Sequence, residues 1–394
     1  MTNKQYRFLF VNLPYSGHIN PTIPLVKRLV DVGHSVDYVL DPSFKEIVEG
    51  AGAQLIPYDD YDSSWSDVHR YMKAFEQAYS TAKRVSSESE YDCLIYEAYF
   101  IFGYKLSKDL ALPTVRLFST FAFNHSILEK IRESGGPHLS FMTSKNPLYS
   151  LFVKYYEGKQ DMMITDDFFD EIAEGVQDLN IVYTARAFQP QSDSFSQDRF
   201  IFVGPSIEDN YSDDMPSVPF DELSRPVIYL AMGSLLPRFA KKVYQNCIDA
   251  FSGKEASLIL SVGDELSKDD FRHVSDNIYL YSKVPQIDVL NQSDVFITHG
   301  GMNSANEGLS CGVPMLVHPF VNDEPLIASR LTDLKVAEQL NLRKSDPEVI
   351  YDKTMALLND EQVKSASADM KDTMTSLGAN DTALENIMRY LDSQ

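Results

Sequence analysis

The sequence predicts an α/β protein built from two halves, each with its own parallel sheet. Its 394 residues exceed the length at which a single hydrophobic core keeps growing, so two domains are expected. Apolar strand signals alternate with helix signals along both halves, which is the pattern of βαβ units. Between the halves lies GPSIEDNYSDDMPSVPFDELSRP, whose polar residues and prolines indicate a linker.

The strands of the first half are indicated by apolar runs bounded by turn residues. One runs over residues 6–12, and a loop over 13–21 leads from it into a helix that ends near Val32. Gly33 breaks that helix, and a second strand follows over residues 35–40. Parallel order is expected because helices separate successive strands. Further strands are expected at residues 93–96, 114–118, 181–184 and 200–203.

The second half restarts with an apolar run at residues 227–230. The expected division is an N-terminal domain over residues 1–208, a linker over 209–226 and a C-terminal domain over 227–394. The last helix of the chain can pack back on the N-terminal domain. Later strands are expected at residues 257–262, 278–280, 295–298 and 315–317.

Composition and charge narrow the function classes. The net charge of −22 would repel nucleic acid and anionic lipid surfaces, so neither is an expected partner. The apolar stretches are too short for stable insertion in a membrane, and the N-terminal residues do not resemble a secretory leader. The three cysteines are scattered and form no metal-binding or disulfide pattern, which favours a cytoplasmic protein without a metal.

A glycine-rich turn between a strand and a helix carries the strongest functional signal. The expected strand at 295–298 runs into His299, Gly300 and Gly301. Unpaired N–H groups and a partial positive charge at a helix N-terminus favour an anion. Glycine also lets the backbone approach a phosphate closely. Such turns also occur in α/β proteins that bind no phosphate. The residues that follow the turn are therefore needed to predict whether it binds one.

Those residues extend the signal to a sugar nucleotide. Asn303 and Ser304 open the helix, and Glu307 lies on the same face, where its carboxylate can accept from ribose hydroxyls. The next expected strand leads to Asp323 and Glu324. Because ligands of parallel sheets bind at the carboxyl ends of strands, the turn and this carboxylate pair share one edge. Carboxylates beside a diphosphate favour a neutral polyol such as a sugar.

In order and spacing, residues 284–324 resemble the donor-binding signature of the UDP-glycosyltransferases, a two-domain family that includes plant secondary-product enzymes and bacterial macrolide glycosyltransferases. The resemblance implies the GT-B fold, with two facing Rossmann-like domains and an interdomain cleft. It also implies that His299 and Ser304 contact the diphosphate, that Glu307 holds the ribose, and that Asp323 and Glu324 read the sugar. The matching elements are Val284-Pro285-Gln286, His299-Gly300-Gly301, Asn303-Ser304, Glu307, Gly312-Val313-Pro314 and Asp323-Glu324.

Two departures from that signature concern the donor. Glu324 stands where Gln is usual, which removes an amide donor and leaves glucose favoured but not fixed as the sugar. Lys283 stands where plant members stack a Trp on uracil, so backbone groups around Val284 are expected to hold the base. Gly233 and Ser234, after the first strand of the second half, match a family pair near the donor phosphates.

The loop after the first strand holds the candidate catalytic base, His18. This loop has the glycine spacing of neither a dinucleotide site nor a P-loop. From the residues alone, His18 is an ordinary loop histidine, but the resemblance implies a catalytic base here, with Gly17 near the donor. The dipole of the following helix disfavours imidazolium, which would keep His18 neutral. Glu97 follows the strand at 93–96, where the family has Asp, and either orients His18 or faces solvent.

An aromatic stretch near residue 120 offers either an acceptor pocket or buried core. The candidates for acceptor binding are Phe118, Phe121 and His125.

The expected function is inverting, metal-independent transfer of a hexose to a hydroxyl of a small hydrophobic acceptor. The UDP-sugar is a co-substrate, and no cofactor is expected. Two alternatives stay open. One is a UDP-sugar epimerase on the same fold, and the other is a non-catalytic partner protein whose site is degenerate at Glu97 and Glu324.

Overall fold

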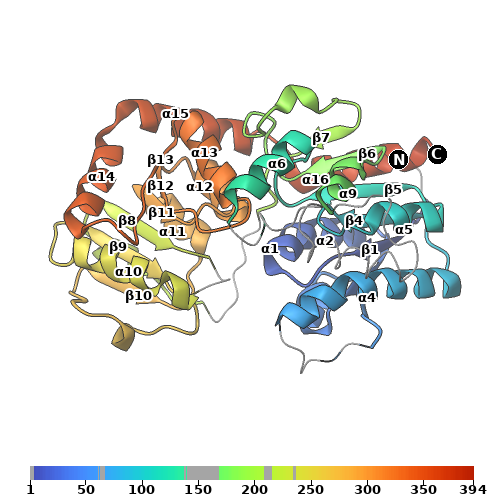
Figure 1. Ribbon diagram of the computed structural model, residues 1–394, viewed down its shortest axis with the longest axis horizontal. Helices are drawn as coiled ribbons and strands as arrows, with labels where there is room; N and C mark the ends of the chain where they lie inside the picture. Colours follow the sequence, from blue (N-terminus) through green and yellow to red (C-terminus); the bar gives the residue numbers. More distant parts are fainter. Residues whose placement is uncertain are drawn as a thin grey trace. The chain divides into compact units, whose positions relative to one another are not determined.

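The computed structural model describes residues 4–60, 62, 67–136, 139, 168–207, 215–233 and 237–394. The chain divides into two compact units, each with one parallel sheet (Figure 1). Unit 1 consists of Met1–Arg132, Pro137–Ile207 and Leu377–Gln394, and unit 2 of Glu133–Gly136 and Glu208–Ser376. The predicted α/β fold with two parallel sheets is confirmed.

Unit 1 holds a seven-stranded sheet with the strand order β3-β2-β1-β4-β5-β6-β7. The strand order changes direction beside β1, so the carboxyl ends of β1 and β4 flank the point where such sheets bind ligands. All the strands predicted for this half are present, although β6 begins two residues early. Their bounds are β1 Arg7–Val11, β2 Ser35–Leu40, β3 Gln54–Pro57, β4 Cys93–Glu97, β5 Thr114–Phe118, β6 Leu179–Val182 and β7 Phe200–Phe202.

The helices of unit 1 pack around this sheet. They are α1 Ser16–Ile19, α2 Ile23–Asp31, α3 Lys45–Gly50, α4 Asp67–Glu88, α5 Gly103–Leu110, α6 His125–Ser134, α9 Phe168–Glu174 and α16 Ala379–Asp392. Helix α6 ends in residues that are grouped with unit 2. Three short 3₁₀ turns, η1 Asn20–Thr22, η2 Pro42–Phe44 and η3 Ser192–Ser194, complete the unit.

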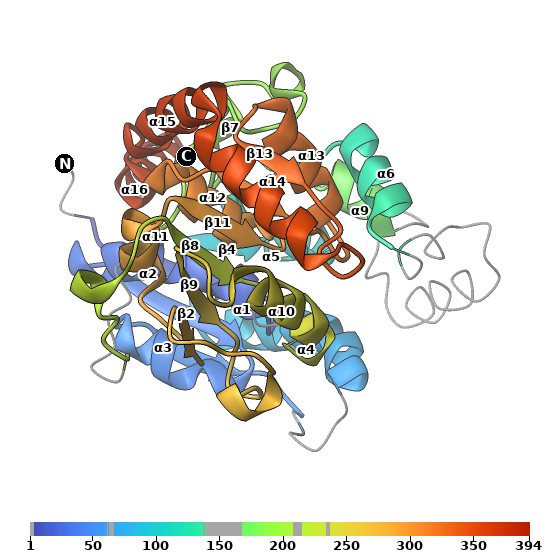
Figure 2. The same cartoon turned by 90° about the vertical axis from the view of Figure 1, so that its left-hand side faces the viewer.

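Unit 2 holds a six-stranded sheet with the order β10-β9-β8-β11-β12-β13. Helices cover both faces, since α10 packs with α14 and α12 packs with α15 (Figure 2). The strands are β8 Val227–Ala231, β9 Ser257–Ser261, β10 Ile278–Tyr281, β11 Val295–Thr298, β12 Met315–Val317 and β13 Ala337–Gln339. The helices are α10 Pro237–Phe251, α11 Gln286–Gln292, α12 Met302–Cys311, α13 Glu324–Asp333, α14 Pro347–Asn359 and α15 Glu361–Thr375, with 3₁₀ turns η4 Phe220–Glu222 and η5 Lys268–Asp270.

Burial explains why the predicted strands are so clear in the sequence. Every residue of β4, β5, β8 and β11 is buried, as expected when helices cover both faces of a parallel sheet. The sequence missed β3 and β13, whose residues are few and partly exposed. Among the helices of the described ranges, none is long and apolar enough to cross a bilayer.

The last helix, α16, completes the core of unit 1. Its buried residues Ala383, Ile387 and Leu391 recur every fourth position and join the cluster that contains Leu25 and Leu29 of α2. An ion pair between α2 and α16 and a hydrogen bond from the Tyr6 hydroxyl to Asp392 (3.2 Å) fasten both ends. Figure 1 shows α16, in red, among elements from the first half of the chain.

Loss of a buried side chain from α16 should destabilise unit 1. The Ile387→Ala variant is expected to lose about 2–5 kcal/mol, the usual cost of removing a buried branched side chain. Hydrogen-exchange mass spectrometry in guanidinium would report the loss on unit 1 peptides. Glu385→Ala, an exposed substitution on the same helix, should change stability by less than about 0.5 kcal/mol. Equal effects of the two variants would contradict a core role for α16.

Candidate functional site

His18 lies in the first turn of a helical stretch that begins earlier than the sequence predicts. Helix α1 starts at Ser16, so the predicted loop over 13–21 is too long. A 3₁₀ turn accommodates Pro21 at a position where its missing N–H costs nothing. Below the helix, the buried Asn12 amide donates to the His18 carbonyl (3.1 Å) and to the Tyr38 hydroxyl (3.0 Å). This network fixes the backbone that carries the imidazole.

Glu97 reaches His18 from the neighbouring strand. Strands β1 and β4 pair in parallel, so their carboxyl ends meet at one edge of the sheet. Oε1 of Glu97 lies 3.2 Å from Nδ1 of His18, and the Glu97 side chain is only 1% exposed. The alternative of a solvent-facing glutamate is therefore wrong. The extra methylene, compared with Asp, still allows the carboxylate to reach the imidazole.

Ser119 joins the pair, although no motif in the sequence pointed to it. It directly follows β5, which pairs with β4. Its hydroxyl donates to Oε1 of Glu97 (2.8 Å) and lies 3.0 Å from Nδ1 of His18. The backbone N–H of Tyr99 donates to the other carboxylate oxygen (2.8 Å). His18, Glu97 and Ser119 thus form a closed triangle of polar contacts.

The surroundings of Glu97 favour its ionised form. Burial alone would raise the pKa of this carboxyl, but the charge and hydrogen bond of His18 oppose it, together with Ser119 and Tyr99. The net result is a pKa below the ordinary value for glutamate. A charged carboxylate at Nδ1 can hold the ring orientation and stabilise an imidazolium.

Two tyrosines flank the His18 ring. The Tyr99 ring stands perpendicular to it at a centroid distance of 4.9 Å, and the Tyr15 ring lies at 5.8 Å. Gly17 is exposed, and a methyl group there would meet nothing within 4 Å. Aromatic edges therefore lie beside the His18 ring, and the sequence pointed to neither tyrosine.

The aromatic residues predicted to bind an acceptor are placed differently. Phe118 and Phe121 are 1% and 0% exposed, because Phe118 packs on Phe123 and Phe121 packs on Phe188. Phe118 and Phe121 therefore belong to the buried core and do not line an acceptor pocket. His125 lies apart from them on the surface of α6, with Nδ1 3.1 Å from Asp170.

In unit 2, the glycines of the predicted phosphate turn make room for His299. A methyl group on Gly301 would lie 2.4 Å from Nε2 of this ring, and one on Gly233 would lie 2.8 Å from it. Gly300 has a φ of +83°, and a methyl there would strike the Val317 side chain. The glycines thus leave room for the imidazole of His299. From the sequence, we expected them to leave room for a phosphate.

His299 is a neutral polar group. Burial lowers its pKa to about 4, against a hydrogen bond with the Ala231 backbone. Its buried Nδ1 has no hydrogen-bond partner among the described residues. A neutral imidazole carries one N–H, so it can offer an anion a hydrogen bond but no charge.

The start of α12 adds further donors beside His299. Asn303 and Ser304 lie in its first turn and are partly exposed. The first helical backbone bond runs from the N–H of Ala305 to the carbonyl of Gly301, and the N-terminus of a helix favours an anion. Ser234, the other predicted phosphate contact, lies outside the described residues.

Glu307, the predicted ribose ligand, ends a chain of hydrogen bonds that begins at the buried Tyr229 and passes through the partly buried Gln286. Gln286, the first residue of α11, donates to its carboxylate through Nε2. The Tyr229 hydroxyl in turn donates to Oε1 of Gln286 (2.7 Å). Burial raises the pKa of Glu307 to about 7, although the Gln286 hydrogen bond opposes the shift.

Glu324 uses one of its oxygens to hold a turn. Oε2 accepts from the backbone N–H groups of Phe320 (2.6 Å) and Val321 (3.1 Å), while the side chain is 8% exposed. Burial raises its pKa to about 7, and the charge of Asp323 adds to the effect. A glutamine oxygen could accept the same two bonds, so Glu in place of Gln preserves the turn, removes the amide N–H groups and adds a negative charge when the carboxyl is ionised.

At the position predicted for the nucleotide base, the Val284 side chain is buried. Within the described ranges, neither its N–H nor its C=O takes a hydrogen-bond partner. Lys283 points to the exposed Asp264 (3.3 Å). These facts fit recognition of a base by backbone groups.

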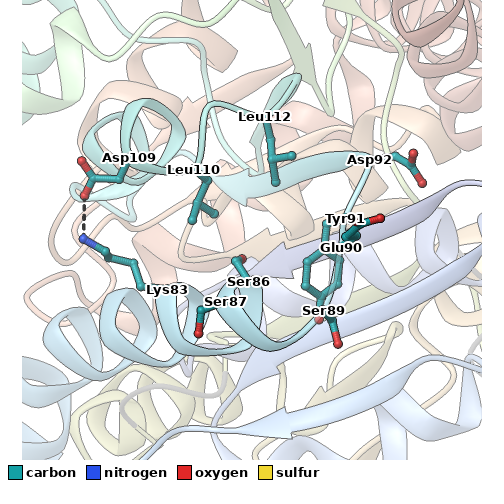
Figure 3. Close-up of a pocket in the computed structure, with 10 residues that line it drawn as sticks. All are labelled: Lys83, Ser86, Ser87, Ser89, Glu90, Tyr91, Asp92, Asp109, Leu110 and Leu112. Carbon is teal, nitrogen blue, oxygen red and sulfur yellow. Dashed lines mark hydrogen bonds and ion pairs between the residues drawn. The ribbon is translucent and has the colours of Figure 1, made fainter.

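A cavity of about 650 Å³ in unit 1 is separate from this chemistry (Figure 3). It lies at the amino ends of β4 and β5, since Asp92 and Leu112 line it just before those strands. Figure 3 shows its Lys83–Asp109 ion pair. His18 and Glu97 lie at the opposite edge of the sheet. In the part of the chain that the structure describes, no group of three or more His, Cys, Asp or Glu could hold a metal ion.

Known proteins resemble this chain in sequence. Residues 245–385, which include α12 and Glu324, match a family model described as erythromycin biosynthesis protein CIII-like, C-terminal domain. The chain is 28% identical to a Bacillus subtilis protein named uncharacterized UDP-glucosyltransferase YdhE, with 98% of this chain and 97% of the relative covered. It is 27% identical to the NDP-glycosyltransferase YjiC of the same organism, with 98% of both chains covered.

Solved structures show the same architecture. The glycosyltransferase of kitacinnamycin superimposes with a TM-score of 0.81 at 24% identity, and the alignment covers 98% of this chain and 100% of that one. At this identity the likeness shows the fold, and the predicted GT-B fold is confirmed.

The crowding around His299 leads to a test of the turn. In Gly301→Ala, the added methyl group must displace the imidazole, so UDP affinity should fall about tenfold or more, the value of one hydrogen bond to a charged group. Isothermal titration calorimetry with UDP measures the change. Gly50→Ala is a matched control, because its methyl group would meet nothing within 4 Å. Unchanged UDP affinity in Gly301→Ala would show that the His299 turn does not bind the nucleotide.

Proposed function

Since this chain is a glycosyltransferase with the GT-B fold, we propose that it transfers a hexose from a UDP-sugar to a hydroxyl group of a small hydrophobic acceptor. Glucose is the favoured sugar, because the relative YdhE is named a UDP-glucosyltransferase. The observation that carries the proposal is the contact of 3.2 Å between His18 and the buried Glu97.

In the proposed reaction, His18 is the general base. Its Nδ1 faces Glu97 and Ser119, so Nε2 is the atom that takes the proton of the acceptor hydroxyl. The Glu97 carboxylate stabilises the imidazolium that results, as in other His–carboxylate pairs. The aromatic edges of Tyr15 and Tyr99 beside the base suit an apolar or aromatic acceptor.

Unit 2 supplies the donor site of the proposal. The diphosphate is held by His299, Asn303 and Ser304 at the start of α12. Glu307 accepts from the ribose hydroxyls, and Asp323 with Glu324 contacts the sugar. Donors already oriented toward the diphosphate stabilise the negative charge of departing UDP without reorganisation.

The proposed displacement is direct and inverts the anomeric carbon. The acceptor oxygen forms a bond with that carbon while the bond from the carbon to the UDP oxygen breaks. The acceptor proton passes to Nε2 of His18, and the electron pair of the broken bond leaves with UDP. A single base and no covalent sugar–enzyme bond are needed, which is why inversion is expected.

The two alternatives have less support. An epimerase needs no base dedicated to an acceptor hydroxyl. The contacts among His18, Glu97 and Ser119 suit such a base and therefore favour a transferase. A degenerate partner protein would have no reason to keep a buried Glu97 in contact with His18, and the substitution of Glu for Asp leaves that contact intact.

Removal of the base should separate catalysis from donor binding. His18→Ala is expected to lower kcat by about 10²- to 10⁴-fold, the usual contribution of a general base, while the Kd for UDP stays near that of the unmodified protein. Glu97→Gln should lower kcat less, because its amide oxygen still accepts from Nδ1 but carries no charge. Steady-state kinetics measures kcat, and calorimetry measures the Kd for UDP. Near-normal turnover of His18→Ala would contradict the assignment of His18 as the general base.

Substrate identity can be tested by mass spectrometry. The protein should convert UDP-glucose faster than UDP-galactose when it is offered a mixed panel of phenols, macrolides and glycerolipids. Proton NMR of the purified product should show a β-glycoside, since inversion of an α-linked donor gives one. Conversion of UDP-glucose to another UDP-hexose in the absence of acceptor would instead support the epimerase.

A further inference from the structure

We propose that Tyr229 is a positioning residue for the donor ribose, because it orients the amide of Gln286 that in turn holds Glu307. The inference rests on the proposed function, since it takes Glu307 as the ribose ligand. It adds a residue that lies inside the β-sheet and touches no substrate.

The chain of contacts runs from the sheet to the helix that faces the donor. Tyr229 belongs to β8 and is 0% exposed. Its ring stacks on that of Phe296 in β11, with centroids 5.1 Å apart and an interplanar angle of 8°. From this fixed ring the hydroxyl reaches Oε1 of Gln286 at 2.7 Å. Gln286 then donates to Oε2 of Glu307 on α12.

Hydrogen-bond chemistry gives the chain a single direction when Glu307 is ionised. A carboxylate only accepts, so Gln286 must turn its NH₂ group toward Glu307. The amide oxygen then faces Tyr229, which must donate its one proton. Without the phenol, the partly buried amide oxygen would lose its protein donor in this orientation, and rotation of the amide would turn its oxygen toward the carboxylate.

The orientation of the amide matters to the nucleotide. An NH₂ group toward Glu307 fixes the rotamer of the carboxylate and leaves its remaining lone pairs for ribose hydroxyls. An amide oxygen in that place would repel the carboxylate and move it from the ribose. Tyr229 therefore acts on ribose binding through two intermediates, and the diphosphate contacts at His299 do not depend on it.

The test compares two nucleotides in Tyr229→Phe. The ratio of the Kd for 2′,3′-dideoxy-UDP to the Kd for UDP measures what the ribose hydroxyls contribute, and base and diphosphate contacts cancel. At pH 8, above the pKa of about 7 for Glu307, this ratio should fall about two- to tenfold in the variant, the value of one hydrogen bond. A merely structural role would weaken both nucleotides equally and leave the ratio unchanged, which would overturn the proposal.

Two further variants show whether the effect passes through Gln286. Gln286→Met removes the amide at similar length and should lower the ratio by itself. Tyr229→Phe added to Gln286→Met should then change nothing more, and a further fall would overturn the relay. If Tyr229→Phe fails to fold, Gln286→Met alone decides, because an unchanged ratio there excludes any action through the amide.

A matched control is Tyr244→Phe. Tyr244 is a second buried tyrosine of unit 2, whose hydroxyl donates to the backbone carbonyl of Ser261 (2.9 Å). This variant should lose stability and keep the wild-type ratio. Failure of the proposed function would look different, because the unmodified protein would then bind UDP no more tightly than the dideoxy nucleotide, or not at all.

Discussion

Parallel pairing of neighbouring strands is the constraint on which the candidate residues of each unit depend. Because β1 and β4 run in the same direction, His18 and Glu97, 79 positions apart by number, end at one edge of the unit 1 sheet. The pairing of β11 with β12 does the same for the His299 turn and the turn that Glu324 holds. An antiparallel partner would have sent either carboxylate to the far edge.

The pKa values of a carboxyl group in each unit are shifted in opposite directions. Glu97 receives hydrogen bonds from Ser119 and Tyr99 and contacts His18, and these interactions outweigh burial. For Glu307 the hydrogen bond from Gln286 does not outweigh burial, so its pKa rises to about 7. The pKa of Glu97 therefore lies below its ordinary value, whereas the pKa of Glu307 lies above it.

Local sequence patterns predicted the buried strands and the glycine-rich turn. Contacts that arise only when strands pair were not predicted. The strands around Ile95 and Ile297 were clear because burial on both faces makes them wholly apolar. The turn at His299 and the helix after it were recognised from glycine and polar spacing. Ser119 and Tyr229 were missed, because their contacts lie across neighbouring strands and helices that no spacing reveals. Phe118 was ambiguous, since an aromatic residue in core and one in a pocket look alike in sequence.

The return of α16 to unit 1 has a consequence for how this protein is made. A ribosome releases the strands of unit 1 long before the residues around Ile387, yet that helix fills part of their core. Part of the apolar surface of unit 1 therefore stays uncovered until unit 2 has been synthesised and α16 has emerged. The core of unit 1 is therefore completed only after the whole of unit 2 has been synthesised, although most of its strands come first in the sequence.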